Sequence, residues 1–193
     1  MDLVTGRECG ECSACCVVLN VDTPEFQKLP GKPCAHLCAQ GCAIHETRFP
    51  VCRAYHCGWR YLAGLPEDWR PDRSGVLVDF QSDDLPPHYP KRPGIRLTVF
   101  GPPETALKPR FLDYVARLVA ADIPVILAVP GPPGFFPAGA LLNDALKEAV
   151  AAREFSAVQA AIAEALRSLA SHKFNPVVHR HVKNAEVSTT GRK

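Results

Sequence analysis

The residues of this chain that could do chemistry are its cysteines. All nine lie between Cys9 and Cys57, and none follows in the rest of the 193 residues. Thiolates are strong ligands for zinc and for iron–sulfur clusters, and cysteines grouped at short spacing are typical of such sites. Cysteines that served only as small buried side chains would not be confined to the first third of a chain. The sequence therefore predicts a metal site in this region.

The cysteines form three groups, within residues 9–16, 34–42 and 52–57. In the first group, two C-x-x-C turns share Cys12, and a fourth cysteine follows without a gap. A C-x-x-C turn places two thiolates so that both can reach one ion. Small residues between these cysteines allow the backbone to wrap closely around such a site. The repetition of the groups makes the signal much stronger than a single C-x-x-C would be.

This ordered pattern resembles the CxxCxxCC family, also called YkgJ-type cysteine cluster proteins, which are described as zinc- or iron-chelating domains. The resemblance covers roughly residues 7–62 and includes the later motifs C-x-H-L and P-x-C-R-x-Y-x-C-x-W. The same cysteine pattern is found in the flagellin lysine-N-methylases. The resemblance implies eight metal ligands, namely Cys9, Cys12, Cys15, Cys16, Cys34, Cys42, Cys52 and Cys57. Cys38 is extra to the family pattern.

Two kinds of cofactor are compatible with these ligands. Eight thiolates could form two closed zinc sites with four cysteines each, or four of them could hold a [4Fe-4S] cluster. The C-x-x-C-x-x-C run resembles the first three ligands of a bacterial ferredoxin cluster, but Cys16 next to Cys15 has no ferredoxin counterpart and indicates a second site. Because all-thiolate sites suit both metals, the sequence predicts either a [4Fe-4S] cluster or Zn²⁺.

Other side chains near the cysteines have expected supporting roles. Three arginines could offset the negative charge of the thiolates: Arg7, Arg48 and Arg53. Three histidines could replace a cysteine as ligand, although a histidine beside such a cluster is more often only its neighbour: His36, His45 and His56. Tyr55 and Trp59 are expected to cover the metal. Asp79, Asp83 and Asp84 lack the spacing of a calcium loop and are expected in a solvated loop.

The elements that must position these residues divide the chain into four segments. Residues 1–63 have too broken a hydrophobic pattern for a core of their own, so we expect metal to hold this module together. Residues 64–75 are a turn-rich connector, residues 76–171 a small α/β domain, and residues 172–193 a basic, flexible tail. The expected fold class is α+β or α/β, with a small cysteine-rich, metal-stabilised module packed on a small sheet with helices.

Periodicity gives the elements of the second domain. Branched and aromatic residues predict strands over residues 76–80 and 95–100, and a short apolar run predicts a buried strand over residues 124–129. Helical spacing predicts a helix over residues 107–120. Strong helix formers over residues 140–170 predict two helices, or one helix interrupted near Arg153.

Composition narrows the function classes. A net charge of +2 favours neither nucleic acid nor membrane as a partner, and no segment approaches the ~20 apolar residues that span a bilayer. The first residues do not resemble a signal peptide, so we expect a cytoplasmic protein whose thiols stay reduced. We expect a non-catalytic metal-binding module, with an unknown protein partner. An iron–sulfur enzyme related to the lysine methylases and a metal-trafficking protein are the alternatives.

Overall fold

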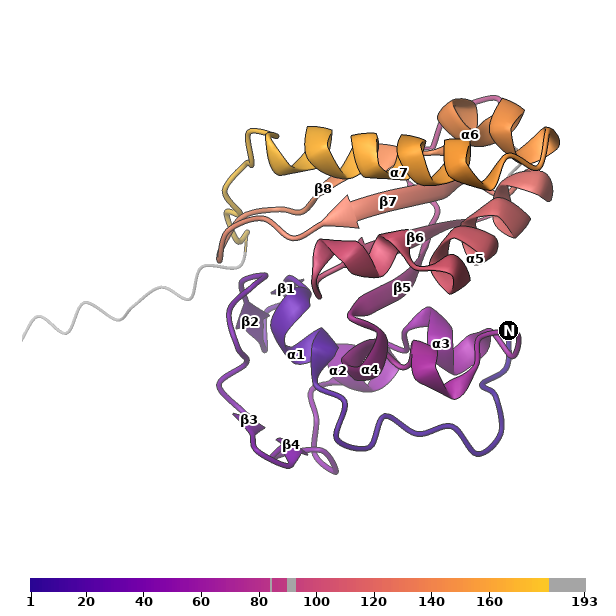
Figure 1. Cartoon of the computed structure of the whole chain (residues 1–193). Helices are drawn as coiled ribbons and strands as arrows, with labels where there is room; N and C mark the ends of the chain where they lie inside the picture. Colours follow the sequence, from indigo (N-terminus) through magenta and orange to yellow (C-terminus); the bar gives the residue numbers. More distant parts are fainter. Residues whose placement is uncertain (84, 90–92, 181–193) are drawn as a thin grey trace, which may run out of the picture.

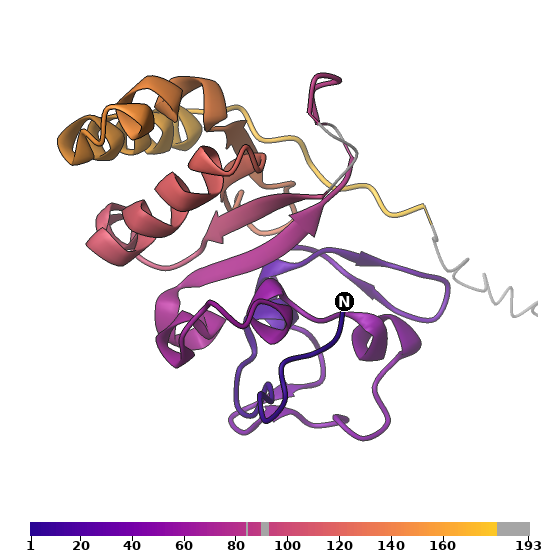
Figure 2. The same ribbon diagram turned by 90° about the vertical axis from the view of Figure 1, so that its right-hand side faces the viewer.

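The chain folds into three layers, with a sheet between a layer of helices and the cysteine-rich region (Figure 1, Figure 2). This arrangement comes from a computed structural model that describes residues 1–83, 85–89 and 93–180. The fold class is α+β, as expected from the sequence. The cysteine-rich region lies on the face of the sheet opposite to the long helices, as Figure 2 makes clear.

The central layer is a mixed sheet of four strands in the order β5-β6-β7-β8. The strands are β5 (Val76–Gln81), β6 (Gly94–Val99), β7 (Val125–Val129) and β8 (Ala138–Leu141). β6 and β7 are parallel, whereas the two outer pairs are antiparallel. Val78, Leu97 and Leu127 stand opposite one another across three strands, so branched and apolar residues line one face.

The helices cover that face. They are the short 3₁₀ helix η2 (Pro103–Leu107), α5 (Pro109–Ala120), α6 (Asn143–Ala151) and α7 (Phe155–Ala170). Val115 of α5 and Ile162 of α7 are fully buried against Leu97 and Leu127 of the sheet. The predicted interruption near Arg153 is confirmed, because this residue adopts a left-handed conformation with φ +59° between α6 and α7.

Strand β8 was not expected. The sequence predicted helix from residue 140, but residues 138–141 pair with β7, with Leu127 opposite Ala140. Alanine, glycine and leucine carry little intrinsic strand preference, so the strand exists because β7 offers an open edge beside it. Tertiary pairing has overridden local propensity here.

The cysteine-rich region consists of short elements. They are α1 (Ala14–Val18), β1 (Val21–Asp22), β2 (Gln27–Lys28), β3 (Leu37–Cys38), β4 (Gly41–Cys42), α2 (Pro50–Ala54) and α3 (Gly58–Tyr61). The strands form two separate two-stranded ribbons. Residues 1–63 are all described, and apart from Pro30 and two glycines the only buried apolar residues among them are Ala14 and Trp59. This region therefore has almost no apolar core of its own.

The connector is more than a link between two regions. It forms the 3₁₀ helix η1 (Glu67–Trp69) and α4 (Pro71–Ser74). Leu65 and Trp69 are buried in the same core as the sheet and helices. Gly75 ends α4 with φ +69°, and the position of its missing Cβ is only 2.9 Å from the Cα of Gly101. A side chain would not fit at this turn into β5.

The start of the expected tail joins the two outer parts of the molecule. Phe135 and Pro176 form a β-bridge, and the Arg180 backbone N–H donates to the Asp22 carboxylate at 2.8 Å. Residues 172–180 are therefore held in place, in contrast to the flexible tail that the sequence indicated; residues 181–193 lie outside the described part.

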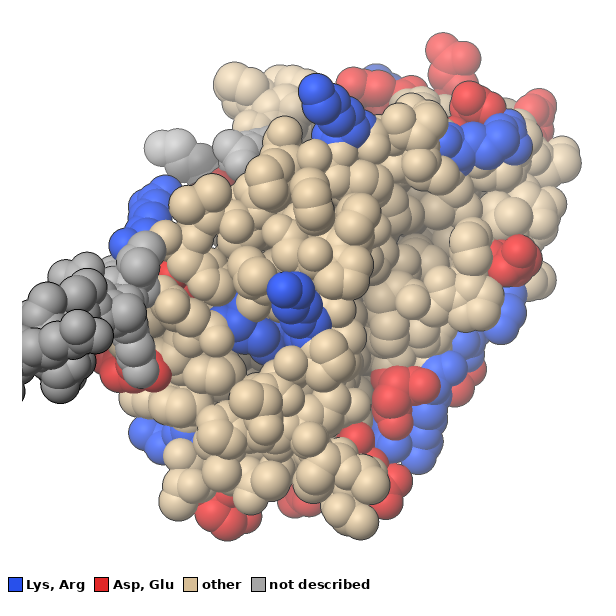
Figure 3. Space-filling view, turned by 90° about the vertical axis from the view of Figure 1, so that its left-hand side faces the viewer, with Lys and Arg blue, Asp and Glu red and all other residues tan. Residues whose placement is uncertain are grey.

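The face that includes this junction is largely uncharged, with a small group of basic side chains near its centre (Figure 3).

No helix in the described ranges has the length and apolar character needed to cross a membrane.

Candidate metal centre

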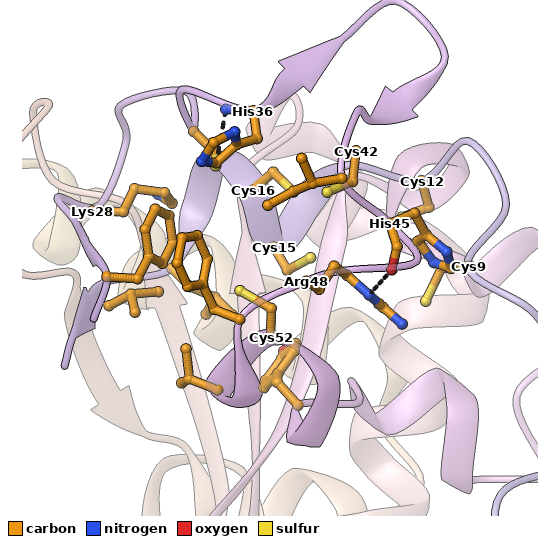
Figure 4. Close-up of a pocket in the computed structure, with 18 of the residues that line it drawn as sticks. Cys9, Cys12, Cys15, Cys16, Lys28, His36, Cys42, His45, Arg48 and Cys52 are labelled. Atoms are coloured by element: carbon orange, nitrogen blue, oxygen red, sulfur yellow. Dashed lines mark hydrogen bonds between the residues drawn. The ribbon is translucent and has the colours of Figure 1, made fainter. Parts of the chain in front are cut away.

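Seven of the eight expected ligands line one pocket of about 140 Å³ on the cysteine-rich side of the sheet (Figure 4). They are Cys9, Cys12, Cys15, Cys16, Cys34, Cys42 and Cys52. Apolar side chains, including Leu19, Phe26 and Phe49, complete much of the wall. Cys57 does not line the pocket, and Cys38 is exposed and lies outside it. The three cysteine groups of the sequence thus meet in one place.

Short elements and turns bring the cysteines together. α1 carries Cys15 and Cys16, β4 ends with Cys42, and α2 carries Cys52. Pro50 opens α2, as its fixed φ favours at a first helical position.

Backbone hydrogen bonds set the remaining spacing. The Cys12 N–H donates to the Cys9 carbonyl at 2.9 Å, which closes the first C-x-x-C turn. The Cys34 N–H donates to the Cys16 carbonyl at 2.9 Å and joins the first group to the second. Ligands that are remote in sequence are therefore held together by the main chain.

The adjacent thiols of Cys15 and Cys16 are coupled. Their mutual hydrogen bond raises the pKa of Cys15 and lowers the pKa of Cys16, and burial adds to the rise at Cys15. One of the two thiols therefore ionises much more readily than the other. Both can be thiolates together only if a cation compensates the second charge.

Apart from the strong coupling between Cys15 and Cys16, the electrostatic contacts between thiols link the eight cysteines as two sets of four. The negative charges of Cys9 and Cys12 contribute to the raised pKa of Cys15. The pKa of Cys57 is raised to about 11, mainly by burial and in part by the charge of Cys9. Burial likewise raises the pKa of Cys52, and three further cysteines add to it: Cys16, Cys34 and Cys42. We call these sets the Cys9 group (Cys9, Cys12, Cys15 and Cys57) and the Cys16 group (Cys16, Cys34, Cys42 and Cys52). Four thiols is the number that one tetrahedral zinc or one [4Fe-4S] cluster requires.

The donors suit a thiolate-bound metal in kind and in number, but they do not form a closed coordination shell. All nine cysteines are free thiols. Among the residues that the structure describes, no group of three or more His, Cys, Asp or Glu side chains is arranged to hold a metal ion. The fold thus gathers seven sulfurs in one pocket without arranging them as a closed ligand shell.

Arg7 does not offset thiolate charge as its position in the sequence indicated. Its guanidinium donates to four backbone carbonyls just after Cys57, including that of Leu62 at 3.0 Å, and lies 4.9 Å from the centre of the Trp59 ring. Arg7 therefore ties the segment before the first cysteine group to the segment after the third. Its role is to hold the two ends of the cysteine-rich region together.

Unlike Arg7, the cationic side chains of Lys28 and Arg48 line the pocket. Lys28 and Arg48 add to the lowering of the Cys16 pKa by its hydrogen bond with Cys15, and Arg48 partly opposes the rise of the Cys52 pKa. Arg53 is exposed, and its guanidinium donates to the Arg48 carbonyl at 2.5 Å. Arg48 thus matches the expected role, whereas Lys28 was missed because no local pattern marks a lysine as buried.

A tyrosine–aspartate pair joins the pocket to the sheet. Tyr55 lines the pocket, and its hydroxyl donates to the Asp79 carboxylate on β5. Burial raises the pKa of both groups. The expectation of a solvated loop is wrong for Asp79, because its side chain turns toward the cysteine-rich layer; Asp83 is exposed, and Asp84 is outside the described residues.

The connector contributes a second support. The Asp72 carboxylate accepts a hydrogen bond from the Cys12 thiol and is held by the Arg70 guanidinium at 2.7 Å. The hydrogen bonds from Arg70 lower the pKa of Asp72, while burial raises the pKa of Cys12. No sequence pattern predicts this contact, because the composition of the connector indicates only turns.

The aromatic and histidine side chains mostly pack beside the sulfurs. His36 and His45 line the pocket, and the His36 ring lies 5.8 Å from that of Phe49. His56 packs edge-on to Tyr61 at 6.0 Å. No histidine belongs to a metal-holding group within the described ranges. Trp59 is buried in the main core instead of covering the pocket.

Comparisons with known proteins add no relative to this picture. No family model, no curated protein and no solved structure matches the chain.

Proposed function

We propose that this protein binds metal through the thiolates of the Cys9 group and the Cys16 group, as a non-catalytic module that metal holds in shape. The observation that carries the proposal is the meeting of seven cysteines, from three separate stretches of chain, in one pocket. Chance placement of free thiols would not bring them together while leaving Cys38 outside.

Because residues 1–63 have little apolar core, the proposed metal would stabilise the fold of this region. Among residues 1–63, the only buried apolar residues apart from Pro30 and two glycines are Ala14 and Trp59, and the helices and strands there are at most five residues long. A region of this size and composition needs another source of stability. Metal–thiolate bonds supply it, because metal binds the folded arrangement of thiols and not the unfolded chain.

Two centres account for the two groups of four thiols. Two zinc ions would use all eight cysteines as closed sites, and closed four-thiolate zinc sites are structural. A [4Fe-4S] cluster would use one group and leave the other for a second centre. In both cases the thiols lose their protons on binding, so the raised pKa values of the buried cysteines make binding weaker in acid.

The setting and the partner follow from the same chemistry. None of the nine cysteines forms a disulfide, and cysteines stay reduced and able to bind metal in a reducing compartment, so we propose a cytoplasmic location. The net charge of +2 favours a protein partner over nucleic acid.

Anaerobic purification of the full chain tests this function. We expect elemental analysis to find either about two zinc ions per chain, or iron with an equal amount of acid-labile sulfide and a brown colour. Zinc would identify the centres as structural, and iron would identify at least one group as a cluster site. A colourless chain that carries neither metal, and that takes up neither zinc nor iron and sulfide on reconstitution, would overturn the proposal.

A further inference from the structure

Lys28 is a buried charge at the wall of the pocket. Its side chain on β2 is 6% exposed, and Nζ donates to the carbonyls of Val17 at 3.0 Å, Leu29 at 3.0 Å and Lys32 at 3.1 Å. A neutral amine has two N–H donors, whereas an ammonium has three. Three carbonyl acceptors therefore fit the protonated, positively charged form of Lys28.

This ammonium faces sulfur and not carboxylate. Among the described residues, Lys28 forms no ion pair with Asp or Glu. The groups whose negative charge acts on it are Cys34, Cys16 and Cys15, in that order. A buried charge without a counter-ion is strongly destabilising, and carbonyl dipoles replace only part of its hydration.

Thiols supply the missing charge only when they are ionised. A free cysteine is mostly protonated at neutral pH, and burial favours the protonated form further. Metal binding removes these protons and leaves four thiolates around each ion. A zinc ion with four thiolates carries a net double negative charge, which the Lys28 ammonium would halve.

Lys28 also fixes the two stretches of chain that carry Cys16 and Cys34 of the Cys16 group. Val17 follows Cys16 directly, and Lys32 comes two residues before Cys34, so the ammonium holds both stretches at once. Lys28 lies at the end of the pocket opposite to Cys9 (Figure 4). Its charge is therefore placed on the Cys16 group more than on the Cys9 group.

We infer that Lys28 is the counter-ion and positioning residue of a metal–thiolate centre formed by the Cys16 group. The inference rests on the proposed function and adds to it that the two centres differ: the Cys16 group has the Lys28 ammonium beside it, whereas Arg70, the cation near Cys12 of the Cys9 group, is already paired with Asp72. The centre beside Lys28 holds its metal more tightly because the excess negative charge is compensated.

Three variants of the full chain test this role after loading with Zn²⁺ or Co²⁺: Lys28→Met, Lys28→Arg and Lys32→Met. Lys28→Met removes the charge at similar size, and Lys28→Arg keeps the charge. Lys32→Met is the matched control, because that side chain is exposed and only its backbone carbonyl meets Lys28. The measurements are metal content, the rate of zinc transfer to a chromophoric chelator, and the spectrum of the cobalt form.

Lys28→Met is expected to release one of two zinc ions about 10-fold faster, equivalent to roughly 1.4 kcal/mol. Lys28→Arg should release zinc within about threefold of the wild-type rate, and Lys32→Met should release it at the wild-type rate. In the cobalt form of Lys28→Met, the thiolate-to-cobalt charge-transfer band should move to longer wavelength, because thiolates without the nearby cation give up electron density more easily. The ligand-field bands, which report tetrahedral geometry, should not move.

Each contrary result has a distinct meaning. If Lys28→Met releases zinc at the rate of Lys32→Met and leaves the charge-transfer band in place, the inference fails while the proposed function stands. If Lys28→Arg is as labile as Lys28→Met, Lys28 acts only as a clamp and is not a counter-ion. If Lys28→Met does not fold, the test uses Lys28→Arg alone. Zinc release from Lys28→Arg that is 10-fold faster than from the wild type would then contradict the role of Lys28. A wild-type chain that binds no metal overturns both proposals.

Discussion

The two regions of this molecule are held together by different means. In residues 76–171, buried side chains from all four strands and the three long helices form one apolar cluster. In residues 1–63, the contacts are mainly hydrogen bonds to backbone carbonyls, such as those of Arg7 and Lys28, around a pocket of thiols. The sheet and helices are stabilised by burial of apolar surface, whereas under our proposal the cysteine-rich layer is stabilised by metal bound to its thiolates and by docking to the sheet.

The docking between the regions is specific. Leu77 and Ala128 are buried although they point away from the core side chains of their strands, on the face that the cysteine-rich layer covers (Figure 1). Gly58 at the start of α3 packs against the Val78 side chain of the edge strand β5, and Tyr55 reaches Asp79 on the same strand. Loss of structure in one region should therefore weaken the other without unfolding it.

Ligand substitutions should have the largest effect and should act on one region. Cys12→Ser and Cys52→Ser each remove one ligand, from the Cys9 group and the Cys16 group respectively. We expect at least half of the bound metal to be lost in each, together with cooperative folding of residues 1–63, because metal binding and folding are linked there. Elemental analysis and thermal unfolding measure both effects.

Cys38→Ser is the matched control, since Cys38 is exposed and outside the pocket. It should keep the full metal content. Full metal retention in the Cys12 variant would contradict the ligand assignment.

A core substitution should give the opposite pattern. Leu127 is fully buried at the centre of the sheet, and Leu127→Ala should lower the free energy of unfolding by roughly 2–5 kcal/mol. Because the side chain lies on the helix-covered face, the metal content should stay at the wild-type value. Denaturant unfolding with metal analysis of the folded protein checks this. Metal loss as large as that of Cys52→Ser would mean that the two regions are not stabilised separately.

Gly58→Ala tests the contact between the layers. A Cβ at this position would lie 2.6 Å from Cγ1 of Val78, so α3 must move away from β5. We expect a loss of about 1–3 kcal/mol in the free energy of unfolding, as for other overpacked contacts. Gly64→Ala is the control, because nothing lies within 4 Å of its added Cβ. Equal stability of the two variants would show that the layers are not closely packed at this point.

Tyr55→Phe should have the smallest effect. It removes the hydroxyl that donates to Asp79, but Arg96 still offsets the charge of this carboxylate. The expected loss is about 1 kcal/mol, with unchanged metal content. Thermal unfolding of the metal-loaded protein measures it. A variant that is as stable as the wild type would remove this pair from the docking interface.

The sequence predicted the regular elements well where their signal is local. Branched residues mark β5, and Val158, Ile162 and Leu166 mark the buried face of α7. β8 could not be predicted, because Ala138–Leu141 becomes a strand only through its pairing with β7.

The same distinction applies to the candidate site. The spacing alone predicted that Cys9 and Cys12 lie close to each other in one turn, since a C-x-x-C turn depends only on local backbone contacts. It could not predict that Lys28 is buried, that Asp72 meets Cys12, or that Arg7 binds carbonyls remote in sequence. These contacts depend on how the layers pack, and a single sequence without its fold carries no local sign of them.

Hydrogen exchange, measured region by region on the metal-loaded chain before and after chelation, tests the central claim most directly. If metal holds the cysteine-rich layer, chelation should remove the protection of backbone amides in residues 1–63, such as that of Cys34. Amides in β6, β7 and α7 should keep most of theirs, because the apolar core is intact. Unchanged protection in residues 1–63 after complete metal removal would contradict the account.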